Sequence, residues 1–219
     1  MSVATEPDHH RAQRKDAVEN RRRVIDAARI IFAEHGLDAR VEEVAQVARV
    51  GIGTLYRHFP TKDALVGELV RELLETVVGL AHDAENVPGG EGLERFLFAT
   101  AEAQAANRGC LARLWNDSES VSLRQDCFEA AQRLLLDAQR HDRIRADATL
   151  TDIDLLFWAL RGILEATGTD SAPAWRRQIA ITVAGLRPSP EPLAEAAVTL
   201  SYVAPLRPGI QISQENAAR

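Results

Sequence analysis

Apolar residues recur at helical spacing along most of this 219-residue chain, and this periodicity is the strongest limit on its fold. From Leu65 through Leu73 to Leu80 they return every three or four residues and mark one face of a long helix. No stretch of any length alternates apolar and polar residues as a half-buried strand does. Aromatic residues make up only 5% of the chain, so the core must consist mainly of aliphatic side chains, which suits helices. The sequence therefore predicts an all-α protein.

The periodic segments indicate helices of very different lengths. A first helix is expected from Arg21 to a C′ glycine at Gly36, and shorter ones at about 41–48 and 51–59. A fourth should begin after Thr61, whose hydroxyl suits an N-cap, and run to about Asn86. Further helices are expected at 92–107, 110–116, 122–141, 151–166 with Thr151 as N-cap, 172–186 and, as a short extra piece, 193–203.

The segment GIGTLYRHF at residues 51–59 follows a short helix across a tight turn, which is the arrangement of a helix-turn-helix. Gly51 can serve as its N-cap, and Gly53 allows close approach of another backbone. Leu55 and Phe59 are four residues apart and should share a core-facing side.

The other side chains of this segment suit DNA. Thr54 at the helix N-terminus and His58 can bind phosphate oxygens. Tyr56 offers a ring for a thymine methyl or a sugar and a hydroxyl for a phosphate. Arg57 can reach a guanine edge with two hydrogen bonds, or a phosphate.

The charge distribution fits this interpretation better than the net charge of −6 does. Residues 11–23 contain six basic and two acidic side chains, whereas most of the acidic residues follow residue 61. A basic end on an acidic body orients a molecule toward phosphate. Taken alone, the basic run would indicate only a solvated tail.

Residues 21–69, above all GIGTLYRHFPTKDAL, resemble the N-terminal domain of the tetracycline-repressor (TetR) family of regulators. The resemblance is specific over residues 20–70, rests on helix number and length over 71–186, and is absent from the tails. It implies that Thr54, Tyr56, His58 and Lys62 touch DNA, with Lys62 clamping the flanking backbone. Ile52 and Arg57 are the candidates that face the bases.

Two positions depart from the family pattern. The turn between the second and third helices usually holds glycine but here holds Arg49, at a cost of ~1–2 kcal/mol if the turn is left-handed. A phosphate contact by Arg49 could recover part of that cost. Arg40 replaces the usual Thr, Ser or Pro that opens the second helix. The predicted DNA-contacting set is Arg40, Arg49, Ile52, Gly53, Thr54, Tyr56, Arg57, His58 and Lys62.

These features predict two domains linked by the fourth helix, which starts near residue 62. Residues 20–64 form the three-helix DNA-binding domain, and residues 65–187 form a helical bundle for ligand binding and dimerisation. Residues 1–19 are expected to be a disordered basic tail, and residues 188–219, with five prolines, a loose tail.

A homodimer would place two reading helices about 34–36 Å apart on a palindromic operator. Small and apolar residues of the last two long helices are the predicted seam: Leu155, Ala159, Gly162, Ile163, Ala166, Ile179 and Val183. A ligand cavity is predicted from residues on several helices: Phe96, Trp115, Asn116, Phe128, Leu135 and Phe157. Trp115 beside Asn116 would form a pocket wall with a polar handle.

The expected function is that of a repressor released from its operator by an unidentified small apolar or amphipathic ligand. A transcriptional activator, or a ligand-binding protein with a degenerate, weakly DNA-binding head, are the alternatives. An enzyme is not expected, because the chain has no GxSxG, HExxH or Walker pattern. No metal or cofactor is expected, since Cys110 and Cys127 lack metal spacing. Without a signal peptide or membrane segment, the protein is expected to be cytoplasmic.

Overall fold

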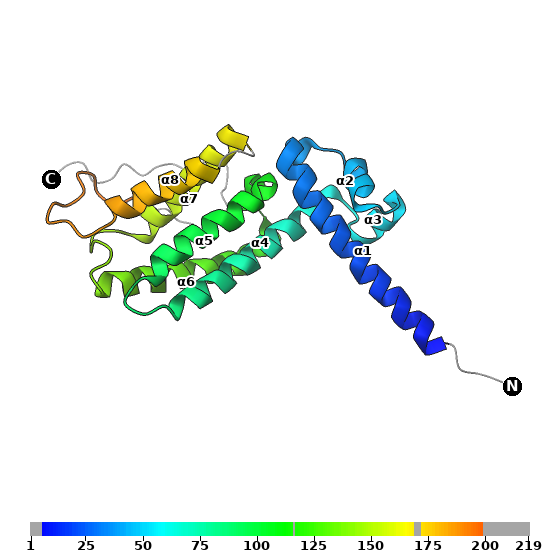
Figure 1. Ribbon diagram of the computed structural model, residues 1–219, viewed down its shortest axis with the longest axis horizontal. Coiled ribbons are helices and arrows are strands. Elements are labelled where there is room, and N and C mark those ends of the chain that lie inside the picture. The colour runs from blue at the N-terminus through cyan, green and yellow to red at the C-terminus, as the bar shows by residue number, and fades with distance from the viewer. Residues whose placement is uncertain (1–5, 116, 169–171, 199–219) are drawn as a thin grey trace.

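The computed structural model describes residues 6–115, 117–168 and 172–198, and within these ranges all regular structure is helical (Figure 1). Helices α1 (Glu6–His35), α2 (Val41–Ala48) and α3 (Ile52–His58) form the head at one end of the molecule. Helix α4 (Lys62–Glu85) runs from the head into the body, beside α5 (Gly92–Ala106) and α6 (Val121–Arg140). Helices α7 (Leu150–Thr167) and α8 (Ala172–Gly185) complete the body, and the predicted all-α fold is confirmed.

The head is held together by an apolar core shared by its three helices and the start of α4. Leu55 and Phe59, predicted as core residues, are 1% and 3% exposed. They belong to one buried cluster with residues of α1, α2 and α4: Val24, Ile25, Ala28, Phe32, Val44 and Leu65. Thr61 caps α4 as predicted, since its Oγ1 accepts a hydrogen bond from the Ala64 N–H at 3.0 Å.

The head meets the body where α1 crosses the 3₁₀ helix η2 (Arg108–Arg113). The Arg108 Nε donates to the Ala33 carbonyl at 2.8 Å. From α1, Arg29 donates to Asn107 Oδ1 at 2.8 Å and to Glu72 Oε2 of α4 at 2.9 Å. Two guanidinium groups therefore tie α1 to the segment that follows α5.

Two expectations about the ends of the chain need correction. Helix α1 begins at Glu6, so residues 6–19 are helical and not disordered. After Pro7, which the first turn of a helix tolerates, this stretch has no glycine or proline and is rich in good helix formers. Residues 193–198 are not helical; the Leu193 N–H donates to Asp147 Oδ2 at 3.2 Å, and Arg145 donates to the Glu191 carbonyl at 2.8 Å. The rest of the predicted 193–203 helix lies outside the described residues.

The start of α7 also differs from the prediction in detail. The N-cap is Thr149 and not Thr151, because Thr149 forms a capping box with Asp152. Asp152 Oδ2 accepts from the Thr149 N–H at 2.7 Å. Thr149 and Thr151 both have an aspartate three positions later, so the sequence pattern alone did not decide between them.

Candidate functional site

The turn between α2 and α3 has the left-handed geometry for which the sequence comparison with the family suggested a glycine. Arg49 adopts φ 54° and ψ 44°, and its N–H donates to the Gln46 carbonyl at 3.1 Å. The Val50 N–H donates to the Ala45 carbonyl at 3.1 Å, which closes α2 and redirects the chain into α3. Because Arg49 has a Cβ, its positive φ lowers the stability of the folded protein.

Replacing Arg49 by glycine should therefore stabilise the protein by about 1 kcal/mol, because glycine adopts αL without the Cβ clash. The Arg49→Ala variant is the matched control, since it removes the charge but keeps the Cβ. Thermal unfolding of both variants checks this. An equal shift in the melting temperature for glycine and alanine would mean that the charge, and not the backbone, sets the effect.

Helix α3 presents one uncovered face. Gly51 is its N-cap as predicted, and its carbonyl accepts from the Thr54 and Leu55 N–H groups at 2.9 and 3.1 Å. Ile52 and Tyr56 are 41% and 44% exposed, Arg57 is exposed, and Thr54 and His58 are half-buried. The side chains of Thr54, Tyr56, Arg57 and His58 make no hydrogen bond or ion pair with the part of the chain that the structure describes. A Cβ on Gly53 would meet no atom within 4 Å, so space is open there too.

The flanking basic residues are arranged differently from one another. Lys62 Nζ donates to the Ala39 carbonyl at 2.7 Å and lies 5.8 Å from the centroid of the Phe32 ring. Lys62 thus uses one of its three ammonium protons in a hydrogen bond within the head, so at most two remain for a phosphate. Arg40 is exposed, makes no side-chain cap to α2, and lies 3.7 Å from Glu42. Arg49 is exposed at the turn.

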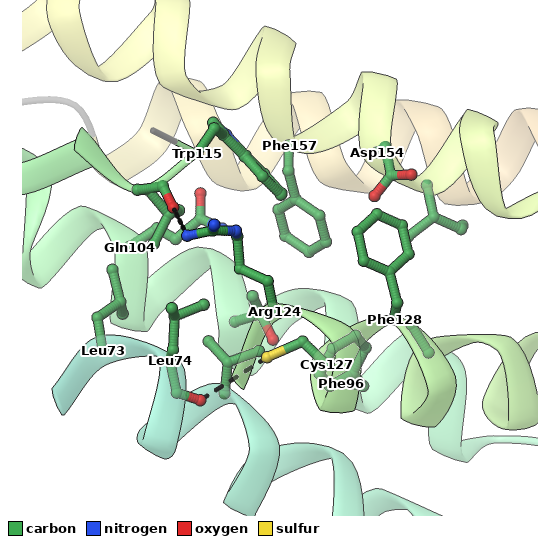
Figure 2. A pocket seen from close by; sticks show the side chains of 15 residues that line it. Leu73, Leu74, Phe96, Gln104, Trp115, Arg124, Cys127, Phe128, Asp154 and Phe157 are labelled. Carbon is green, nitrogen blue, oxygen red and sulfur yellow. Dashed lines mark hydrogen bonds between the residues drawn. The ribbon is translucent and has the colours of Figure 1, made fainter. Parts of the chain in front are cut away.

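A cavity of about 60 Å³ lies in the body between α4, α5, α6 and α7. Four of the six residues predicted for a ligand pocket line it, namely Phe96, Trp115, Phe128 and Phe157, and Figure 2 shows these aromatic side chains around it. Leu135 is 1% exposed and belongs to the core instead of the lining. Asn116 lies outside the described residues.

The same cavity has polar residues that the sequence analysis missed. Asp154 and Thr100 line it, at 7% and 2% exposure. Burial raises the pKa of Asp154 to about 7. Arg124 also lines it and donates to the Asp117 carbonyl at 2.7 Å. One signal could have revealed Asp154: it is a single acid within the apolar run Ile153–Phe157.

The predicted dimer seam divides into two sets. Leu155 is 43% exposed, and Ala159, Gly162 and Ala166 are exposed on the same side of α7, with Ile163 half-buried. Ile179 and Val183 of α8, in contrast, are 0% and 4% exposed within the chain's own core, so they cannot form the seam as predicted. Trp158 on α7 and Ile181 on α8 are further exposed apolar residues, at 41% and 51%.

Both cysteines are free. Burial raises the pKa of Cys110 and of Cys127 to about 12, so both thiols are protonated at neutral pH. Within the described ranges, no cluster of His, Cys, Asp and Glu is arranged to hold a metal ion. Among the helices of those ranges, none combines the length and apolarity needed to cross a bilayer.

The sequence matches known families in both halves. Residues 24–69 match the bacterial regulatory proteins of the tetR family, and residues 88–188 match the SbtR-like transcriptional regulator C-terminal domain. An HTH-type transcriptional regulator of Staphylococcus aureus is 38% identical over 66 residues, which are 30% of this chain and 36% of the relative. The HTH-type transcriptional repressor KstR2 of Rhodococcus jostii is 32% identical over 95 residues, 42% of this chain and 47% of that protein. The matches thus span about a third to a half of these curated relatives.

Solved structures extend the likeness to nearly whole chains. A TetR transcriptional regulator from Streptomyces coelicolor is 31% identical with a TM-score of 0.53, over 77% of this chain and 99% of the other. A TetR regulator from Mycobacterium vanbaalenii is 30% identical with a TM-score of 0.57, over 80% and 99%. With the exposed α3 face, these matches identify the chain as a DNA-binding transcriptional regulator that belongs to the TetR family.

Proposed function

We propose that this protein is a dimeric repressor that binds a palindromic operator through α3 and is released by a small ligand in the body cavity. The observation that carries the proposal is the uncovered face of α3, where a hydroxyl, a phenol, a guanidinium and an imidazole make no internal hydrogen bond or ion pair within the described chain. Side chains of these types on a recognition helix suit phosphates and base edges.

The route from ligand to DNA is supported by α4. This helix begins at Lys62 in the head, and its residues Leu73, Leu74 and Val77 line the cavity. A ligand that binds more tightly to one position of α4 would change the position of α3. Bound DNA must then lower the affinity for the ligand by the same factor by which the ligand lowers the affinity for DNA. A difference of ~5.5 kcal/mol in affinity for the two states would convert nearly complete binding into nearly complete release.

The direct test is a gel shift with DNA from the promoter region beside the protein's own gene. Binding should weaken steeply as salt rises, because neutralised phosphates release counterions. The absence of a shift even at low salt would favour the degenerate-head alternative. Deletion of the gene should raise the neighbouring transcript if the protein represses; a fall would make it an activator.

The Arg57→Ala variant should bind the operator about tenfold more weakly, the typical loss of one base or phosphate contact. The control is Arg95→Ala on α5, an exposed arginine of the body whose loss changes the net charge equally. Fluorescence anisotropy with the operator and with a scrambled duplex measures both affinities. Equal weakening by the two variants would show that only net charge matters.

The Leu155→Glu variant should dissociate the dimer and weaken operator binding, because it places a charge in the exposed apolar stripe of α7. The matched control is Leu136→Glu, since Leu136 is a leucine of similar exposure, 47%, on α6 and not on α7. Sedimentation equilibrium should show at least a tenfold rise in the dimer dissociation constant for the first variant alone, the effect of about 1.4 kcal/mol. A dimer that tolerates Leu155→Glu would move the interface elsewhere.

A further inference from the structure

The body cavity contains two polar side chains whose hydrogen-bonding needs the described chain does not meet. Asp154 Oδ2 and Thr100 Oγ1 are buried without a hydrogen-bond partner in the described residues, and both side chains line the same cavity. Both residues are more than nine-tenths buried. A buried polar atom left without a hydrogen-bond partner destabilises the folded protein, because its lost hydration is not replaced. The presence of two such atoms in one cavity therefore indicates that a bound molecule supplies their hydrogen-bond partners.

The arrangement of charges shows what is missing. Figure 2 places the Asp154 carboxyl group on the Phe128 side of the cavity and the Arg124 guanidinium on the Trp115 side. Arg124 Nη1 donates to the carbonyls of Asp117 at 2.7 Å and Leu114 at 3.3 Å, and no ion pair joins Arg124 to Asp154. Burial alone accounts for the raised pKa of Asp154, so no cation among the described residues stabilises its charged form.

We propose that the effector is a small lipophilic amine whose ammonium group pairs with Asp154 and whose apolar part lies against the aromatic walls. This inference rests on the proposed function, because it names the ligand class for the same cavity. An ammonium donates to a carboxylate and is also attracted to ring faces, which Phe128 and Phe157 supply. Thr100 Oγ1 offers a further acceptor on the α5 wall. An anionic ligand would be repelled by ionised Asp154, and a neutral one would leave that charge unpaired.

Three probes of equal size and different charge test the proposal: benzylamine, benzyl alcohol and benzoate. Calorimetry with the full chain without DNA, at about pH 8 where Asp154 is ionised, should show benzylamine binding at least tenfold more tightly than benzyl alcohol, and benzoate more weakly than either. Benzylamine binding should weaken as pH falls to about 5.5, as Asp154 takes up a proton.

Only Asp154 should titrate in this range. Among the described residues that line the cavity, the other ionisable groups are Arg124 and Cys127 of α6. The lining residues of α4 and α5, and Leu114 and Trp115 after η2, carry none. The pKa of Cys127 is raised to about 12, so its thiol stays neutral. Arg124 keeps its charge, although burial lowers its pKa.

The Asp154→Asn variant should lose the preference for benzylamine and still bind benzyl alcohol. The control is Asp126→Asn, which removes an exposed carboxylate next to Cys127 on α6. Unchanged benzylamine affinity in Asp154→Asn would overturn the proposal, as would absence of binding by all three probes at millimolar concentration. Tighter benzyl alcohol binding at low pH would instead assign Asp154 as a protonated donor to a neutral ligand. Because these titrations contain no DNA, their outcome is independent of whether a ligand releases the operator.

Discussion

Replacement of Gly109 by alanine is expected to lower the melting temperature by roughly 10 °C, because it forces the head and the body apart. A Cβ at position 109 would lie 2.3 Å from the Phe32 carbonyl carbon, 2.4 Å from its oxygen and 2.6 Å from the Ala33 nitrogen. These are backbone atoms of α1, so no side chain can rotate away to relieve the overlap. The expected loss is about 3 kcal/mol, at the upper end for overpacking.

The position of this contact extends the expectation from stability to function. Gly109 lies in η2 between Arg108, which donates to Ala33, and Cys110, which is 2% exposed. The displacement would therefore break the polar tie between η2 and α1 together with the packing. If a ligand in the body releases DNA through this junction and α4, the variant should respond more weakly to the ligand even where its operator affinity is retained.

The control for this variant is Gly79→Ala on α4. A Cβ at position 79 meets no atom within 4 Å, so alanine should slightly stabilise the helix. Calorimetric unfolding of the two variants and the wild type makes the comparison. An unchanged melting temperature for Gly109→Ala would mean that α1 and η2 are not in backbone contact in solution.

The sequence was most informative where one local rule decides the structure. The cap at Thr61 and the buried pair Leu55 and Phe59 each depend on residues within a few positions of one another, whereas a left-handed turn at Arg49 was suggested by the glycine that the family usually has there. Such features can be read without knowledge of the tertiary fold, because hydrogen bonds and φ limits act locally.

Features that depend on distant partners were harder to predict. Ile179 and Val183 form an apolar stripe on α8, but periodicity shows only that the stripe is buried, not whether its partner is the same chain or a second copy. Lys62 was expected to contact DNA. In the fold its Nζ also contacts the Ala39 carbonyl and the Phe32 ring, and both residues are far from Lys62 in the sequence. The sequence pattern is equally consistent with Leu135 in the wall of a cavity and in the core, and only the packing of the folded chain distinguishes these positions.

The Asp154→Asn variant should be more stable than the wild type at about pH 8, by about 2–3 kcal/mol after allowance for partial solvent screening, and about equally stable at about pH 4. The reason is that burial raises the pKa of Asp154 from 3.8 to about 7. Below the unfolded-state pKa the carboxyl group is protonated in both states and contributes no difference. As pH rises from about 4 to about 7, the unfolded chain releases this proton while the folded chain keeps it, so stability falls. Asparagine cannot ionise and escapes this loss.

Thermal unfolding of both proteins across this pH range measures the effect, with Asp126→Asn as the exposed control whose difference from the wild type should stay small throughout. A constant difference between Asp154→Asn and the wild type would mean that the carboxyl group is solvated or paired in the folded state. Saturating benzylamine should then act in the opposite sense at about pH 8: it raises the wild-type melting temperature by pairing the ionised carboxylate and has little effect on the variant. The Asp154 carboxylate thus destabilises the protein without a ligand and stabilises it with a bound amine. Binding is therefore selective for positive charge, because only a cation compensates for the burial of this carboxylate.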